Sequence, residues 1–241
     1  MTAIITGASR GIGAAIAETF AENDINVIIN FLSHEWEAKA LRDKLNTKAG
    51  KNIAEICKSD VSNPEDVLRL KNFCNEIFGE CDILINNAGI SLQKLITQTT
   101  TDEWDRLFDV NVKGVYLMTN AVLPEMINRK SGVIINISSV WGISGASCEV
   151  AYSASKASVI GFTKALSREL GPSGIRVNCI APGVIDTPMT QVHSPETLAD
   201  LCGETPLCRI GKPFDIAEAA LYLAKADFMT GQVLTVDGGI I

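Results

Sequence analysis

The segment that decides the fold is Thr2–Phe20, which reads TAIITGASRGIGAAIAETF. Its first five residues form a short apolar run that is typical of a buried strand. The glycine-rich turn Gly7–Gly13 follows, and apolar side chains then recur at helical spacing. Such a turn lets a pyrophosphate approach the backbone at the positive end of a helix. The segment therefore predicts the first half of a dinucleotide-binding βαβ unit, with a glycine-rich loop that binds no ligand as the alternative.

Strands and helices are predicted to alternate along the rest of the 241 residues. Further strands are expected at 26–31, 52–57, 82–86, 133–137, 176–181 and 232–236. Helices are expected at 35–48, from 64, from 101, at 151–170 and at 214–225, with short helices on a loop over 186–207. Short apolar strands between helices indicate a parallel sheet that is covered on both faces, which is an α/β doubly wound fold. Because no repeat or linker interrupts the pattern, we expect one domain over residues 1–241.

Composition excludes several classes of protein. The chain is 46% hydrophobic and 20% charged, with a net charge of −7 and no basic run, which argues against nucleic acid or an anionic membrane as a partner. The seven cysteines are scattered without a Cys-x-x-Cys pair, so no metal site is expected. Reduced thiols, together with the lack of a signal peptide or a long apolar run, lead us to expect a cytoplasmic protein.

Tyr152 and Lys156 are the first catalytic candidates, because a spacing of four places both on one face of the expected helix 151–170. A cation beside a phenol lowers a pKa that starts near about 10, which would give an acid/base that works near neutral pH. Ser139 follows the strand 133–137 and can donate a hydrogen bond to a substrate oxygen. A helix that merely happens to carry a tyrosine and a lysine is the alternative.

The cofactor preference is predicted from the end of the second strand. An enzyme that prefers NAD usually places an Asp or Glu there for the adenosine ribose. In this chain no acid occurs between Asn30 and Glu35, and Arg10 in the glycine turn can reach a 2′-phosphate. The charges therefore favour NADP(H), unless Arg10 is simply a solvated loop cation.

Other polar candidates also follow expected strand ends, namely Asp60, Asn86–Gly89 and Pro182-Gly183. The carboxyl ends of parallel strands meet at one edge of a sheet, so these residues should converge there. Asn111 lies inside an apolar helix instead, and its residue type alone favours a structural asparagine that is bonded to backbone.

In combination these motifs resemble the classical short-chain dehydrogenase/reductase family. The matching residues are Thr6–Gly13, Asp60-Val61, Asn86–Gly89, Asn111, Ser139, Tyr152-x-x-x-Lys156, Pro182-Gly183 and Asp237–Gly239. They span nearly the whole chain in the order of the family. The resemblance implies a seven-stranded Rossmann-like sheet, hydride transfer between NAD(P) and an alcohol/ketone pair, and a homotetramer.

The resemblance also implies the role of each site residue. Tyr152 would donate the proton in reduction, Lys156 would hold the nicotinamide ribose and lower the pKa of Tyr152, and Ser139 would bind the carbonyl oxygen. Asn111 would hold a water in a proton relay, which replaces its structural interpretation. The expected cofactor-binding residues are Gly7, Ser9, Arg10, Gly11, Ile12, Gly13, Asn30, Asp60, Val61, Asn87, Ala88, Gly89, Tyr152, Lys156, Pro182, Gly183, Ile185 and Thr187.

Within the family, the turn GASRGIG and the segments Asn136–Ser139, Arg176–Asn178 and Val236–Ile240 are similar to those of 3-oxoacyl-[acyl-carrier-protein] reductases. That resemblance implies NADPH-dependent reduction of a 3-oxoacyl thioester in fatty acid biosynthesis. The acyl group would be carried on acyl carrier protein, which is acidic and could meet Arg129 and Lys130.

Two alternatives remain open. The similar reductases usually carry Gln-x-Asn just before the active tyrosine, whereas Glu149 stands three residues before Tyr152 in this chain. A carboxylate there suits hydroxyl-rich substrates, so a reductase or dehydrogenase of a sugar, a sterol or another small alcohol is the first alternative. A non-catalytic, cofactor-binding regulator is the second, and the complete set of polar site residues argues against it.

Overall fold

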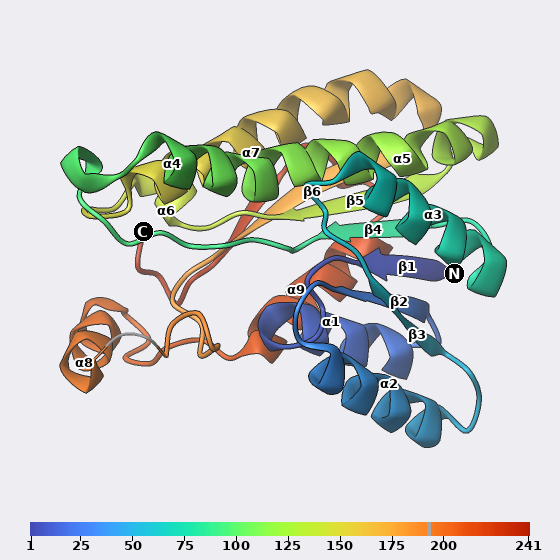
Figure 1. Cartoon of the computed structure of the whole chain (residues 1–241), viewed down its shortest axis with the longest axis horizontal. Helices are drawn as coiled ribbons and strands as arrows, with labels where there is room; N and C mark the ends of the chain where they lie inside the picture. The colour runs from blue at the N-terminus through green and yellow to red at the C-terminus, as the bar shows by residue number, and fades with distance from the viewer. Residues whose placement is uncertain (192–193) are drawn as a thin grey trace.

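A computed structural model describes residues 1–191 and 194–241. All strands belong to one 7-stranded parallel sheet in the order β3-β2-β1-β4-β5-β6-β7 (Figure 1). The strands are β1 (Thr2–Ile5), β2 (Asn26–Phe31), β3 (Ala54–Lys58), β4 (Ile83–Asn86), β5 (Gly132–Ile137), β6 (Ile175–Pro182) and β7 (Val233–Val236). The chain winds outward from β1 to β3 and then returns to β4 beside β1. This reversal confirms the doubly wound fold and creates the crevice in which such sheets bind ligands.

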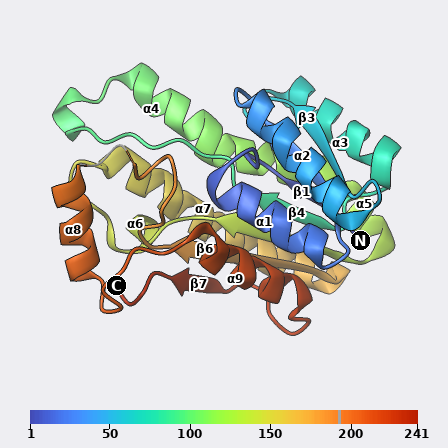
Figure 2. The same ribbon diagram turned by 90° about the horizontal axis from the view of Figure 1, so that it is seen from below.

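Helices cover both faces of the sheet. On one face lie α1 (Gly11–Glu22), α2 (Glu35–Ala49) and α9 (Pro213–Lys225), and on the other lie α3 (Pro64–Phe78), α5 (Gly114–Arg129) and α7 (Val150–Leu170), as Figures 1 and 2 show. Three shorter helices lie beyond the carboxyl ends of the strands: α4 (Thr101–Phe108), α6 (Trp141–Ser144) and α8 (Pro195–Glu204). Among the described residues, no helix is long and apolar enough to cross a membrane.

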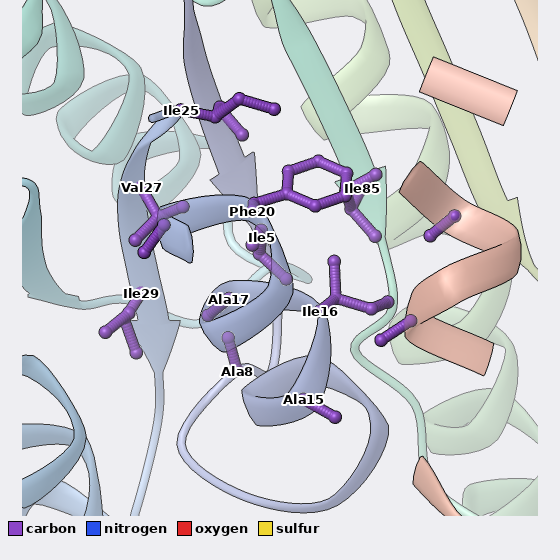
Figure 3. Packing of buried hydrophobic residues seen from close by; sticks show 14 of the residues in the cluster. Ile5, Ala8, Ala15, Ile16, Ala17, Phe20, Ile25, Val27, Ile29 and Ile85 are labelled. Carbon is purple, nitrogen blue, oxygen red and sulfur yellow. The ribbon is translucent and has the colours of Figure 1, made fainter. Parts of the chain in front are cut away.

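The apolar strands are explained by burial on both faces. In β1, Ala3 and Ile5 pack into the core under α1, whereas Ile4 packs into the core on the opposite face. Figure 3 shows Phe20 of α1 with Ile5 and Ile85 around it, and its side chain is fully buried. Burying a side chain of this size contributes roughly 1.5–3 kcal/mol. Because successive strand residues face opposite cores, the strands are continuous apolar runs rather than alternating ones.

Local hydrogen bonds and a glycine determine two helix ends near the site. The cap of α4 is Thr100, because the Thr100 hydroxyl accepts from the backbone N–H of Glu103 and Glu103 in turn accepts from that of Thr100, at 3.2 and 2.9 Å. Glu103 stands three residues after Thr100 and closes this capping box. At the end of α7, Gly171-Pro172 starts a short 3₁₀ turn, and the left-handed residue that stops it is Gly174 (φ 72°).

The helix that was expected to run from residue 101 through Gly114 is interrupted. Residues Asp109–Lys113 form a π-helical turn between α4 and α5. Such turns are single-turn bulges that often lie at functional sites. This turn places the Asn111 side chain in the interior of the protein, where it is buried.

Candidate active site

A cleft of about 760 Å³ lies beyond the carboxyl ends of the strands. The strand-end residues converge there as predicted, and the cleft extends from the glycine turn to α6 and the segment before α8. Of the residues predicted for the site, all line the cleft except Gly13 and Asn111. Gly13 leaves the space that the Asn87 side chain needs, and Asn111 is bonded to the backbone of Ile90, which lines the cleft.

The glycine turn is held in place by side chains from neighbouring strands. Asn30 of β2 accepts from the backbone N–H of Gly7 at 3.1 Å, and the Asn87 amide donates to the carbonyls of Thr6 and Gly7 at 2.8 and 3.1 Å. A Cβ atom on Gly13 would lie 2.6 Å from the Asn87 amide nitrogen, so a glycine is required there. Asn30 therefore supports the turn from the interior.

The turn fits a pyrophosphate. The N-cap of α1 is Arg10, whose side chain makes no capping hydrogen bond, so the N-cap leaves the first-turn N–H groups at the positive end of this helix available. Gly11 faces Thr187 across the cleft, where an added Cβ would lie 3.5 Å from its methyl group. The backbone donors and the narrow glycine passage suit the diphosphate of a nicotinamide dinucleotide.

The end of β2 carries no carboxylate that faces the cleft. Leu32, Ser33 and His34 line it, whereas Glu35 pairs with Lys39 at 2.6 Å and is not part of the lining. Arg10 is exposed, lines the cleft, and has no hydrogen-bonding or ionic side-chain partner among the described residues.

Asp60 lies in the loop after β3, and its carboxylate is held by hydrogen bonds. One oxygen accepts from the hydroxyl and the backbone N–H of Ser62 at 2.6 and 2.9 Å, and the other lies 3.5 Å from the Arg106 guanidinium. Burial favours the neutral acid, but the Ser62 hydrogen bonds and Arg106 outweigh it, so the pKa of Asp60 lies below its ordinary value. The group is therefore a fixed, ionised hydrogen-bond acceptor at the end of the cleft near β3.

Tyr152 is buried at the opposite end, and its pKa differs from the sequence-based expectation. Burial, together with the charge of Glu149, raises the pKa of the phenol to about 12, against a hydrogen bond with Ser139 that lowers it. The predicted lowering by Lys156 is therefore wrong for the protein by itself. The reason is that the Lys156 ammonium donates to the carbonyl of Ile137 at 2.9 Å, and burial lowers its own pKa to about 8.

Ser139 and Lys156 are fixed by the packing of α6 against α7. Ser138 donates from its hydroxyl to the backbone carbonyl of Lys156 at 2.8 Å, and Ser139 accepts from the backbone N–H of Trp141 at 3.2 Å. Gly142 permits the close approach of the two helices, because an added Cβ would lie 2.8 Å from the Lys156 carbonyl carbon. The hydroxyl of Ser139 and the phenol of Tyr152 thus meet at one point of the cleft.

Asn111 is bonded to backbone, as its residue type alone indicated. Its amide oxygen accepts from the N–H of Ile90 at 2.9 Å, and its amide nitrogen donates to the Ile90 carbonyl and the Ser155 hydroxyl at 2.9 and 3.1 Å. The side chain therefore fastens the loop after β4 to α7, directly behind Lys156. The proton-relay role that the family resemblance implies remains a prediction.

Some contacts that hold the site together were not predicted from the sequence. Thr6 accepts at its hydroxyl from the backbone N–H groups of Asn87 and Ala88, both at 2.9 Å, and so joins β1 to the loop after β4. Arg106 reaches the cleft from α4, and Ser138 supports Lys156. These contacts join residues that are distant in sequence, and no local pattern marks them.

Apolar and polar side chains line the cleft beside Tyr152. Trp141, Met189 and Leu201 are apolar lining residues, and Gln93 and Glu149 are polar ones. The loop 186–207 also carries Leu198 and Val192. Leu198 does not line the cleft, and Val192 lies outside the described residues.

Comparisons with known proteins agree with this arrangement. A family model described as enoyl-(acyl carrier protein) reductase matches residues 7–241. The chain belongs to the short-chain dehydrogenase/reductase family. Members of this family are oxidoreductases that act on alcohol and carbonyl groups and bind a nicotinamide cofactor, which the cleft fits.

Individual relatives cover nearly the whole chain. It is 42% identical to 3-oxoacyl-[acyl-carrier-protein] reductase FabG of Chlamydia muridarum over 99% of this chain and 96% of the relative, and 40% identical to an uncharacterized oxidoreductase YmfI of Bacillus subtilis over 99% and 98%. Among solved structures, a 3-oxoacyl-[acyl-carrier protein] reductase of Brucella melitensis with bound NAD superposes with a TM-score of 0.91 and 36% identity, over 99% of this chain and 90% of that one.

Proposed function

We propose that this short-chain dehydrogenase/reductase is an NADPH-dependent 3-oxoacyl-[acyl-carrier-protein] reductase, which converts the C3 ketone of an acyl thioester into a secondary alcohol. The observation that carries the proposal is the buried, protonated phenol of Tyr152 beside Ser139, at the end of a cleft that begins at the glycine turn. The names of the full-length relatives supply the substrate class.

In this proposal the catalytic residues are Ser139, Tyr152 and Lys156, and NADPH supplies the hydride when it is bound. Ser139 donates a hydrogen bond to the ketone oxygen, and Tyr152 transfers its phenolic proton to the same oxygen as the alcohol forms. A phenol with a pKa near 12 is fully protonated at neutral pH, which suits a donor. Lys156, whose pKa is about 8, is largely protonated at pH 7 and would hold the cofactor ribose.

The preference for NADPH over NADH rests on charge. Arg10 lines the cleft without an ionic partner among the described residues, and the nearest acid after β2, Glu35, is paired with Lys39. A guanidinium with no competing carboxylate favours a 2′-phosphate. Asp60 and Val61 would face the adenine in this arrangement.

The carrier would be acyl carrier protein, as the names of the relatives indicate. Arg129 is a poor contact for it, because its guanidinium pairs with Glu80 at 3.0 Å and also donates to the carbonyl of Cys81, at a distance from the cleft lining. Lys130 remains exposed at the end of α5. Because Lys130 directly precedes β5, at the edge of the sheet opposite the cleft, we assign the carrier contact to neither residue.

We further propose a homotetramer with D₂ symmetry. The outer faces of α5 and α7 expose Tyr116, Ile127 and Val150, at 52%, 42% and 45% of their surface, and the C-terminal Ile241 is 48% exposed. Neighbouring apolar faces of this kind are commonly covered by a second copy. Light scattering at micromolar concentration should give four times the chain mass, and a monomeric mass would contradict this assembly.

A sugar or polyol is a second candidate substrate, because Glu149 lines the cleft and its charge acts on Tyr152. One assay separates the candidates: NADPH oxidation with acetoacetyl thioesters, on a carrier protein and on coenzyme A, against a panel of sugars and polyols. The proposal requires turnover of the thioester to be the faster by far. Faster turnover of a sugar or polyol, with Glu149→Gln reversing the order, would establish the second candidate.

A further inference from the structure

Arg106 bridges two parts of the cleft that are distant in sequence. Its guanidinium donates to the Ser62 hydroxyl at 3.1 Å and lies 3.5 Å from the outer oxygen of Asp60. Arg106 belongs to α4, in the connection from β4 to β5, whereas Asp60 and Ser62 belong to the loop after β3. The interaction therefore connects the half of the sheet formed by β1 to β3 with the half that begins at β4.

The position of Arg106 indicates a role in ligand binding rather than in folding. The side chains of Arg106 and Asp60 are 48% and 26% exposed, and ion pairs at such exposure contribute little to stability. Both residues line the cleft, together with Val61 and Val110. The Arg106–Asp60 pair therefore acts on ligand binding, because it determines the direction in which the Asp60 carboxylate faces the cleft.

The two oxygens of the Asp60 carboxylate have different partners. Ser62 occupies one oxygen, through its hydroxyl at 2.6 Å and its N–H at 2.9 Å. Arg106 faces the other oxygen at 3.5 Å, a distance that orients the group and leaves room for another donor on the same oxygen. Without Arg106, only Ser62 would set the rotation of this side chain.

We propose that Arg106 is a positioning residue for the adenosine end of the nicotinamide cofactor: it orients Asp60 so that its free acceptor site faces the adenine amino group. The inference rests on the proposed function only in taking the cleft as the NADPH site. It concerns binding and requires no knowledge of the carbonyl substrate.

The test is calorimetric binding of three probes to the full chain: NADPH, adenosine 2′,5′-bisphosphate and reduced nicotinamide mononucleotide. Arg106→Gln should weaken NADPH and the adenosine bisphosphate by a similar factor, about three- to tenfold, since both lose the same oriented acceptor. Reduced nicotinamide mononucleotide should bind as tightly as it does to the wild type. In turnover, the KM for NADPH should rise by more than kcat falls.

Two controls separate orientation from charge and from folding. Arg42→Gln removes the same charge from α2, where Arg42 pairs with Asp43 away from the cleft, and should leave all three affinities unchanged. Asp60→Asn should weaken the adenosine probes, and adding Arg106→Gln to it should cost no more, because the two act through one acceptor.

The outcomes distinguish this inference from the proposed function. Equal weakening of all three probes, or additive losses in the double variant, would overturn the role of Arg106 while NADPH-dependent turnover stands. A wild-type protein that binds the adenosine bisphosphate but does not oxidise NADPH with any thioester would overturn the proposed function and leave the inference intact.

Discussion

Lys156 and Tyr152 lie one helical turn apart on α7, with the Lys156 ammonium 5.7 Å from the centroid of the Tyr152 ring. The ammonium is directed to the carbonyl of Ile137. In the protein by itself, the phenol is therefore governed by burial, which keeps it protonated, rather than by its neighbouring cation. The protonation state of Tyr152 determines whether this residue donates or accepts a proton, and at which pH it does so.

Replacing Tyr152 by Phe should leave the fold intact and remove most of the reductase activity. The ring still packs against Leu107 and Ala151, but the proton donor is lost. Loss of a general acid lowers kcat by about 10²- to 10⁴-fold. Tyr222→Phe, at an exposed tyrosine on α9, is the matched control. Turnover of the Tyr152 variant at the wild-type rate would reject the assignment.

Glu149→Gln should shift the pH dependence of the reverse reaction, oxidation of a 3-hydroxyacyl thioester. That direction needs the phenolate as a base, and the charge of Glu149 raises the pKa of Tyr152. Without this charge the rising limb of the pH–rate profile should move to lower pH. Glu169→Gln, at the exposed far end of α7, should leave the profile in place. An unchanged limb in the Glu149 variant would show that its charge does not act on the phenol.

Lys156 should make the stability of the protein depend on pH in the alkaline range. Its pKa falls from 10.5 to about 8 on folding, so between these values the unfolded chain binds a proton that the folded protein has released. The free energy of unfolding of the wild type should therefore rise with pH over this range, relative to that of Lys156→Met, by roughly 3 kcal/mol in total.

This difference can be measured by urea unfolding of both proteins from pH 7 to 10.5. Lys164→Met, at an exposed lysine of the same helix, serves as the control. A difference between wild type and Lys156→Met that stays constant with pH would mean that Lys156 titrates alike in the folded and unfolded states.

Arg10→Ala should reduce the preference of the enzyme for NADPH over NADH. The arginine has no ionic partner to lose among the described residues, so its removal should act on the 2′-phosphate alone. We expect the KM for NADPH to rise by roughly tenfold, the value of one charge-assisted contact, with NADH kinetics nearly unchanged. A wild-type enzyme that uses NADH with the higher kcat/KM would contradict the cofactor assignment itself.

The sequence by itself determined the architecture and the place of the site. The segment Thr2–Phe20 and the alternation of apolar strands with helices specify a doubly wound parallel sheet, because a strand that is apolar on both sides must be covered on both sides. The polar residues that follow the strands then meet at one edge through chain connectivity alone. For this reason the cleft lining agrees with the residues that the motifs singled out.

Only the tertiary structure decided the burial, the hydrogen bonds and the charged neighbours of those residues. Tyr152 and Lys156 are neighbours in any helix, yet the pKa of each depends on burial by other segments and on the Ile137 carbonyl. The partners of Asn111, and the bridge from Arg106 to Asp60, join segments more than 20 residues apart. Hydrogen bonding, desolvation and charge interactions act over a few ångströms in space, and a pattern along the chain does not contain those distances.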